Sequence, residues 1–275
     1  MPSRAKIFGI LNITDDSFSD AGKYLEPEAA ISHGRELARA GADVVDIGAA
    51  SSNPMSRSVP PEVEIDRLSA VTPALKDAGI AVSIDSYALE VQRWALKQGI
   101  AYLNDIQGFP FPEFYPELAA SEARLIVMHS VQGLGPATRI AVDPGEIFGR
   151  VVRFFDERLA QLEKAGIARE RLIIDPGMGL FLGTRREASF AVLRQLSELK
   201  ARYRLPALIS VSRKSFLRTF LGRSPQEAGP ASLAAELYAA LVQGVDYVRT
   251  HDPASLKDAL TVWQAMEGGA PVSPG

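Results

Sequence analysis

The 275-residue sequence contains no cysteine and only three histidines. Without cysteine the chain can form no disulfide, no thiolate metal site and no thiol nucleophile, which is compatible with a reducing compartment. A protein zinc site usually needs several histidines or cysteines, and no H-E-x-x-H motif is present. We therefore expect no metal centre built wholly from protein ligands.

Long apolar runs and a strong net charge are also missing. The longest apolar candidate, residues 231–245, is interrupted by Glu236 and falls short of the roughly 18 residues that a membrane span needs. The amino-terminal stretch is broken by Asn12, Asp15 and Asp16, which argues against a signal peptide. A net charge of −3 is unlike the basic surface of most nucleic-acid binders. The sequence thus predicts a soluble, cytoplasmic protein without membrane or nucleic-acid partners.

Eight short apolar runs alternate with eight helix-length amphipathic segments. Continuous apolar runs are typical of parallel strands that are covered on their faces. The expected strands are residues 7–11, 44–47, 81–84, 101–103, 125–128, 171–174, 207–211 and 246–251. The expected helices are residues 26–40, 62–78, 88–98, 114–121, 144–164, 187–203, 225–243 and 253–266. This pattern predicts a single (β/α)8 TIM-barrel domain over residues 1–267, followed by a disordered tail at 268–275.

A doubly wound open sheet is the competing fold. Such a sheet would usually carry a G-x-G-x-x-G motif after its first strand. Here the glycines at 177, 179 and 183 have the spacing G-x-G-x-x-x-G, one residue longer than the motif, and they follow the sixth strand instead of the first. No P-loop pattern occurs either, so the barrel is favoured.

Polar residues follow seven of the eight expected strands, and in a barrel these positions form the active-site face. They are Asn12, Asp85, Asn104, Asp105, His129, Asp175, Ser212, Arg213, Lys214, Arg249 and His251. Each could singly be a helix cap, a turn residue or a buried structural histidine. A helix cap does not need lysine, arginine and carboxamides around it, so the combination favours a ligand site.

The residue types suggest a ligand with two different ends. Lys214, Arg249 and His251 follow the last two strands, where barrels often bind phosphate. Asp85 and Asp175 offer carboxylates that could bind the N–H groups of a guanidine-like heterocycle by two parallel hydrogen bonds. A Mg²⁺ ion held mostly by phosphate and water would need only one or two protein oxygens, and Asn12 could supply one.

Seven segments together resemble the motif series of the dihydropteroate synthase family, in the family's order and over nearly the whole chain. They are GILNITDDSFSD at 9–20, VSIDS at 82–86, LNDI at 103–106, VMH at 127–129, DPGMG at 175–179, SRKS at 212–215 and RTHD at 249–252. The resemblance implies a TIM barrel that joins 6-hydroxymethyl-7,8-dihydropterin diphosphate to p-aminobenzoate. It also implies an SN1-like mechanism, Mg²⁺ as cofactor and a homodimer.

The resemblance assigns roles by position. For the pterin it implies Asp85, Asn104, Asp175 and Lys214 at the ring edge, with Ile106 and Met128 against the ring face. For the diphosphate it implies Asn12, Arg249 and His251, with Asn12 as the metal ligand. For p-aminobenzoate it implies Phe18, Ser52, Pro54, Ser212 and Lys214.

Two departures from the family pattern flank the p-aminobenzoate pocket. The second loop reads SSNPM at 51–55 instead of the usual STRPG, and the segment after DPG, residues 179–184, is about two residues longer. These departures are similar to those of the sulfonamide-resistant branch of the family. We therefore expect a sulfonamide-insensitive synthase in which Phe181 contributes to drug discrimination.

Two other functions share part of this pattern. A methyltransferase barrel that binds a folate pterin could use the same carboxylates but would not need a diphosphate clamp. A non-catalytic pterin-binding homologue could lose Lys214, Arg249 and His251, which are all present here.

Overall fold

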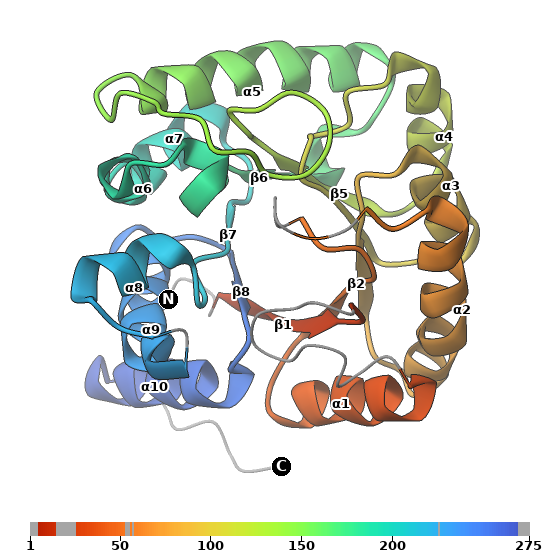
Figure 1. Ribbon diagram of the computed structural model, residues 1–275, viewed down its shortest axis with the longest axis horizontal. Coiled ribbons are helices and arrows are strands. Elements are labelled where there is room, and N and C mark those ends of the chain that lie inside the picture. The colour runs from red at the N-terminus through yellow and green to blue at the C-terminus, as the bar shows by residue number, and fades with distance from the viewer. Residues whose placement is uncertain (1–4, 15–25, 53–55, 57, 225, 269–275) are drawn as a thin grey trace.

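The computed structural model describes residues 5–14, 26–52, 56, 58–224 and 226–268. Eight parallel strands form one sheet in the order β6-β5-β4-β3-β2-β1-β8-β7. A bridge between Ile174 and Ala207 joins the two ends of that order, so the sheet closes on itself. The predicted TIM barrel is confirmed, with the strands in a ring and the helices around them (Figure 1).

The strands are short and begin close to their predicted positions. They are β1 Lys6–Asn12, β2 Val44–Gly48, β3 Val82–Asp85, β4 Tyr102–Asp105, β5 Arg124–Met128, β6 Leu172–Asp175, β7 Leu208–Ile209 and β8 Tyr247–Thr250. The α-helices are α1 Pro27–Arg39, α2 Pro61–Asp77, α3 Leu89–Lys97, α4 Tyr115–Ala120, α5 Ile147–Lys164, α6 Arg186–Leu193, α7 Leu196–Tyr203, α8 Ser215–Leu221, α9 Gly229–Leu237 and α10 Pro253–Met266. None of the described helices is long and apolar enough to cross a membrane.

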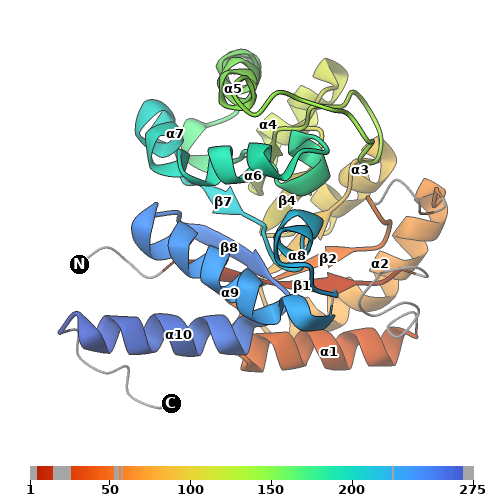
Figure 2. The ribbon, with the colours of Figure 1, turned by 60° about the vertical axis from the view of Figure 1, so that its left-hand side comes forward.

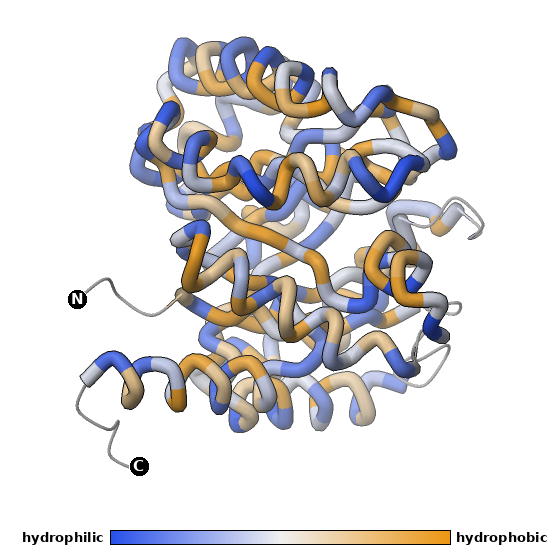
Figure 3. Tube along the Cα trace, turned by 90° about the vertical axis from the view of Figure 1, so that its left-hand side faces the viewer, coloured by the Kyte–Doolittle hydropathy of each residue, from blue (hydrophilic) through white to orange (hydrophobic). Residues whose placement is uncertain are grey.

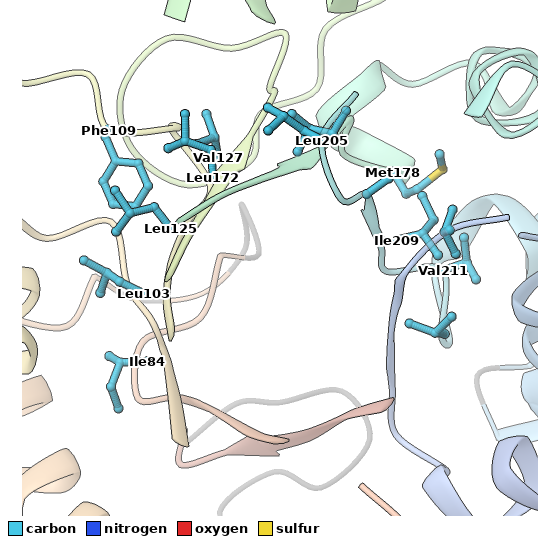
Figure 4. Packing of buried hydrophobic residues seen from close by; sticks show 14 of the residues in the cluster. Ile84, Leu103, Phe109, Leu125, Val127, Leu172, Met178, Leu205, Ile209 and Val211 are labelled. Carbon is cyan, nitrogen blue, oxygen red and sulfur yellow. The ribbon is translucent and has the colours of Figure 1, made fainter. Parts of the chain in front are cut away.

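Apolar side chains on the outer face of the strands form the main core against the helices. Because successive residues of a strand point to opposite faces, every second strand residue belongs to this layer. Figure 4 shows Ile84, Leu103, Leu125 and Leu172 on the outer side of the ring, and all four are fully buried. Along the helices, apolar and polar segments alternate in turn, as expected for elements with one face on the barrel (Figure 3).

The inner face of the barrel is divided into an apolar floor and a polar upper part. The floor consists of Phe8, Val44, Tyr102, Ile126, Ile173, Leu208 and Tyr247, one residue from each of seven strands. Within it the rings of Phe8 and Tyr102 meet edge to face with centroids 5.0 Å apart. Residues two or four positions further along each strand therefore point to the same interior above this floor.

Three helical predictions need correction. The single helix predicted at 187–203 is two helices, α6 and α7, because the chain breaks at Gln195 and the N–H of Ser197 is capped by the side chain of Gln243 at 3.0 Å. The segment predicted as one helix at 225–243 contains α9 and a π-helix, Tyr238–Val242. The preceding short helix α8 was not predicted, and it ends at Gly222, whose φ is +65°.

The sixth strand also begins one residue later than predicted. Arg171 lies in a 3-10 turn, and its guanidinium donates to the carbonyls of Ala123 and Leu118. Helix α9 lies alongside α10 on one flank of the barrel (Figure 2). Of the predicted disordered tail, residues 268–275, only Gly268 lies within the described residues.

Candidate active site

A cavity of about 580 Å³ opens at the carboxyl ends of the strands. Nine of the residues that were assigned a role from the sequence line it: Asn12, Ser52, Asp85, Ile106, Phe181, Ser212, Lys214, Arg249 and His251. Three others, Asn104, Met128 and Asp175, are buried but are not among the lining residues. Phe18 and Pro54 lie outside the described residues. The structure thus brings most of the predicted set to one concave surface.

Strand register explains why these side chains converge. Phe8 of the apolar floor and Asn12 are four residues apart on β1, so both point inward. On β8 the inward positions after Tyr247 are Arg249 and His251. A two-residue period carried from the floor to the strand end therefore places polar groups in the cavity.

Arg249 lies between two carboxylates. Its Nη2 donates to Oδ2 of Asp85 at 2.7 Å, and its Nε donates to Oδ2 of Asp46. Asp46, on β2, is fully buried and was not predicted as a site residue. The two carboxylates raise the pKa of Arg249 against the effect of burial, which lowers it. The predicted diphosphate residue and the predicted pterin residue are therefore direct neighbours.

The carboxyl group of Asp85 is held in a form that resists ionisation. Burial raises its pKa to about 7, although Arg249 and Lys214 lower it, and Asp46 raises it further. At a pKa of about 7 the neutral and the charged carboxyl coexist near neutral pH, and a cationic or strongly donating ligand favours the charged form. Perturbed acids of this kind are typical of functional sites.

Asp175, which is buried, and Lys214, which lines the cavity, interact electrostatically. Oδ1 of Asp175 accepts the N–H of Gly177 at 2.8 Å, while burial raises the pKa of Asp175 to about 6. Burial and Arg249 lower the pKa of Lys214 to about 8, and the two aspartates oppose this shift. The Nζ atom of Lys214 also lies 4.9 Å from the ring centroid of Phe181, within range of a cation–π contact.

An apolar wall borders these charges. Ile106, Met128, Ala137 and Phe181 form a separate buried cluster, with Tyr87 and Leu180 packed against it. Next to this wall, Oδ1 of Asn104 is buried without a hydrogen-bond partner among the described residues. A flat ring with a polar edge would satisfy both the wall and the unpartnered amide oxygen.

The segment from Asp175 to Thr184 is fixed in place by backbone contacts. Its 3-10 turn η3, Gly179–Leu182, carries Phe181, whose carbonyl accepts the N–H of Val131 at 3.0 Å. Gly177 has φ of +74°, and a Cβ there would lie 2.4 Å from the carbonyl oxygen of His129. Only glycine suits this position, so the turn presents Phe181 in a defined orientation.

His251 and Ser212 face each other at the ends of β8 and β7. Oγ of Ser212 lies 3.0 Å from Nδ1 of His251 and accepts its backbone N–H at 3.1 Å. Burial and the cations Arg213, Arg249 and Lys214 lower the pKa of His251 well below its ordinary value, so the ring is neutral. His129, by contrast, serves the fold: it is buried, its Nδ1 lies 3.1 Å from the Pro176 carbonyl, and its pKa is lowered to about 4.

The oxygen donors at the cavity are compatible with Mg²⁺. Among the described residues no three histidine, aspartate or glutamate side chains are grouped to hold a metal ion. Asn12 lines the cavity and offers a neutral oxygen, the hard type of ligand that Mg²⁺ accepts. The residues present are therefore compatible with an ion held mainly by ligand oxygens and water, with at most one or two protein contacts.

Sequence reasoning missed three buried acids near the site: Asp46, Glu64 and Glu236. Glu64, on α2, lines the cavity, and burial raises its pKa to about 7 while the neighbouring Ser86 lowers it. Asp46 could have been found, because a carboxylate two residues beyond the inward-pointing Val44 must point into the barrel. Glu64 and Glu236 lie on helices, and no strand-end rule identifies them.

Residues 8–251 match the family described as pterin binding enzyme. The chain belongs to the pterin-binding enzyme family. Within it the chain is 54% identical over 261 residues to dihydropteroate synthase type-2 of Escherichia coli, covering 95% of this chain and 96% of that protein.

Solved structures agree with this membership. The dihydropteroate synthase of Coxiella burnetii in complex with pteroic acid has a TM-score of 0.86 at 28% identity, covering 96% of this chain and 94% of that one. The Xanthomonas albilineans dihydropteroate synthase with 4-aminobenzoic acid has a TM-score of 0.86 at 35% identity, covering 98% and 95%. The chain is therefore a member of the dihydropteroate synthases within the pterin-binding family.

Proposed function

We propose that the protein condenses 6-hydroxymethyl-7,8-dihydropterin diphosphate with p-aminobenzoate to give 7,8-dihydropteroate and diphosphate. The observation that carries this proposal is the single cavity in which Asp85, Lys214, Arg249 and His251 lie beside an apolar wall. This cavity joins acceptors for a heterocycle to cations for a diphosphate. The relatives named above, all dihydropteroate synthases, support the same reaction.

The carboxylates would bind and stabilise the pterin end. Asp85 and Asp175 would accept the N–H groups of the ring edge, and Asn104 would satisfy its unpartnered oxygen there. Ile106 and Met128 would pack against the ring face. As the C–O bond to the diphosphate breaks, positive charge develops on the pterin, and buried carboxylates stabilise that charge strongly in a site of low dielectric.

The cations would hold the leaving group. Arg249, His251 and Lys214 would compensate the charge of the departing diphosphate, with Asn12 as one ligand of a Mg²⁺ ion bound mainly to the diphosphate. Magnesium supplies charge neutralisation to the leaving group. The amine of p-aminobenzoate then forms the new C–N bond and loses a proton, so no activated protein nucleophile is needed.

The acceptor would lie toward the loops. Ser52 is half-buried at the cavity, where its carbonyl accepts the N–H of Ala137 at 2.9 Å. With Phe18, Pro54, Ser212 and Lys214 it would bind p-aminobenzoate.

We further propose that this synthase is insensitive to sulfonamides and that Phe181 contributes to the discrimination. A thousandfold preference corresponds to about 4 kcal/mol, more than the roughly 1–3 kcal/mol that one methylene supplies. A rigid wall together with a reshaped loop can reach that value. Phe181 is 5% exposed, lines the cavity and is carried by a turn fixed at several points.

We also propose that the protein forms a homodimer. The support is the resemblance to the family together with exposed apolar side chains, among them Phe220, Leu221 and Val242. Such side chains are stabilised when a partner covers them. Light scattering coupled to size exclusion measures the mass and rejects this proposal if only the monomer is found.

The reaction is tested by diphosphate release from the purified protein. We expect release that requires both substrates and a product with the mass of dihydropteroate. A methyltransferase barrel would instead release no diphosphate and would demethylate a methylated folate. A non-catalytic homologue would bind the pterin and yield neither product.

A further inference from the structure

Residues 129–146, between β5 and α5, form a loop that contacts three of the other loops around the cavity. We call this segment the bridging loop. Its backbone groups are hydrogen-bonded to the loops that follow β2, β4 and β6. Ala137 and Arg139 of the bridging loop also line the cavity. Because one segment is bonded to three separate loops, it can fix how these loops lie relative to one another.

On one side the bridging loop holds the turn that carries Phe181. The N–H of Val131 donates to the carbonyl of Phe181 at 3.0 Å. The N–H of Thr184 donates to the carbonyl of Ile140 at 2.8 Å. Between these two bonds lies Gly183, whose φ is +113°, and a Cβ there would lie only 3.0 Å from the carbonyl oxygen of Ile140. The turn is therefore bonded to the loop at two points, and a side chain at Gly183 would push the two apart.

On the other side the bridging loop holds the second loop. The N–H of Ala137 donates to the carbonyl of Ser52 at 2.9 Å. The methyl group of Ala137 belongs to the same buried cluster as Phe181, Ile106 and Met128. Ala137 therefore contributes to the apolar wall and fixes Ser52 at the same time.

The side chain of Gln107 anchors the bridging loop to the barrel. Its Oε1 accepts the N–H of Gly135 at 3.1 Å, and its Nε2 donates to the carbonyl of Tyr87 at 3.0 Å. Gln107 is 9% exposed and is not among the described residues that line the cavity. Both ends of its amide are bonded to backbone atoms of other loops, so this side chain holds the loop in place from outside the cavity.

We propose that the bridging loop, anchored by Gln107, couples Ser52 to the turn of Phe181 and thereby makes the apolar wall stiff enough to exclude sulfonamides. Gln107 is then a positioning residue for drug discrimination. The two segments at which the sequence departs from the family pattern are linked through this one loop. The contacts stand by themselves, whereas their use against sulfonamides rests on the proposed function.

A wall discriminates against a larger ligand only if it does not yield to that ligand. A sulfonamide carries a sulfonyl group and a further substituent where p-aminobenzoate carries a carboxylate, so the drug needs more room. Discrimination of this kind requires the wall to keep its position within about 0.5 Å. The hydrogen bonds of the bridging loop resist such a movement, because they would have to stretch or break before Phe181 could move away.

The variant Gln107→Ala tests the anchor, since it removes both hydrogen bonds of the amide. We expect the sulfamethoxazole inhibition constant to fall by about tenfold, the scale of one lost hydrogen bond. The KM for p-aminobenzoate and the affinity for free pterin should stay close to wild type. Gln243→Ala is the matched control: Gln243 is 8% exposed, and its amide also makes two hydrogen bonds, with Ser197 and Tyr238. This control should leave the inhibition constant unchanged.

The variant Gly183→Ala tests the contact between the turn and the loop, independently of how well Gln107→Ala folds. The added Cβ should push the turn away from Ile140 and lower the inhibition constant as well. Gly166→Ala is its matched control, because Gly166 also has a positive φ, +88°, but an added Cβ would meet none of the described residues within 4 Å beyond its chain neighbours. It carries the backbone strain without the contact and should leave the inhibition constant unchanged.

Combination with Phe181→Ala shows whether the bridging loop acts through the wall. If it does, Gln107→Ala should have almost no further effect on the inhibition constant once Phe181 is replaced. Equal fold-changes in both backgrounds, or no change in either Gln107→Ala or Gly183→Ala, overturn the proposal and leave the proposed role of Phe181 standing. An inhibition constant of Phe181→Ala equal to that of wild type rejects the proposed discrimination, and this inference with it.

Discussion

We predict that Asp85 destabilises the folded protein near neutral pH, where its carboxylate is needed to bind the pterin, and the variant Asp85→Asn tests this. Its pKa of about 7 lies above the roughly 3.9 of an unfolded aspartate, because burial outweighs the attraction of Arg249. A carboxyl whose folded pKa is raised stabilises the protein fully below the unfolded value. That stability is lost as the pH rises from about 4 to about 7.

The size of the effect follows from the shift. Each pKa unit is worth about 1.4 kcal/mol, and integration between pH 5 and pH 8 gives a loss on the order of 3 kcal/mol for Asp85 alone. Asparagine does not titrate, so Asp85→Asn does not suffer this loss. The difference in unfolding free energy between Asp85→Asn and wild type should therefore shift in favour of the variant by about 3 kcal/mol when the pH rises from 5 to 8. Urea unfolding of both proteins at both pH values measures this difference. Any pH-independent effect of the substitution on packing cancels when the two pH values are compared.

Asp175→Asn provides a graded comparison. The pKa of Asp175 is raised to about 6, so its pH-dependent gain should be roughly half that of Asp85→Asn. Both variants should lose synthase activity, since each removes a proposed pterin acceptor. If Asp85→Asn is destabilised equally at pH 5 and pH 8, then Asp85 is a structural partner of Arg249 and the reasoning is refuted.

Three other outcomes follow from the site. Arg249→Ala should lower turnover by at least about a hundredfold, the scale of one lost transition-state contact. It should also weaken the binding of free pterin, because the guanidinium holds Asp85. If calorimetry shows unchanged pterin binding, the diphosphate end and the pterin end of the site are independent of each other. Phe181→Ala should lower the sulfamethoxazole inhibition constant by roughly 10- to 100-fold. The control variant Phe190→Ala, which removes a partly buried ring from α6, should leave this constant unchanged. If the inhibition constant of Phe181→Ala equals that of wild type, Phe181 does not discriminate against the drug. Chelation by EDTA should abolish diphosphate release and leave pterin binding in place, with recovery on added Mg²⁺, and full activity in EDTA would exclude the proposed metal.

The sequence predicted the barrel and most of its polar face because both depend on short-range periodicity. Asn12, Asp85 and Arg249 lie at strand ends, and a two-residue period fixes the direction in which they point. Asp46 escaped because it stands inside an apolar strand, two residues before the strand end, where a carboxylate was not expected. Its buried contact with Arg249 shows that the interior is polar below the strand ends as well.

Features that depend on packing between distant segments could not be predicted from the two-residue period of the strands. The break between α6 and α7 is capped by Gln243, which lies 46 residues from Ser197 in the chain. Glu236 lies on a helix whose amphipathic pattern is the same whether it faces the barrel wall or the solvent. Only the approach of α9 to the loop after β7, where Oγ of Ser232 accepts the N–H of Arg213, shows that this carboxyl is buried.

We propose above all a dihydropteroate synthase that distinguishes p-aminobenzoate from sulfonamides. The most direct measurement is the rate of diphosphate release from the pterin diphosphate and p-aminobenzoate, with and without sulfamethoxazole, beside a drug-sensitive synthase. We predict release that depends on both substrates and a sulfamethoxazole inhibition constant about a thousandfold above that of the sensitive enzyme, equivalent to about 4 kcal/mol. Absence of diphosphate release, or equal inhibition of the two enzymes, would contradict the claim.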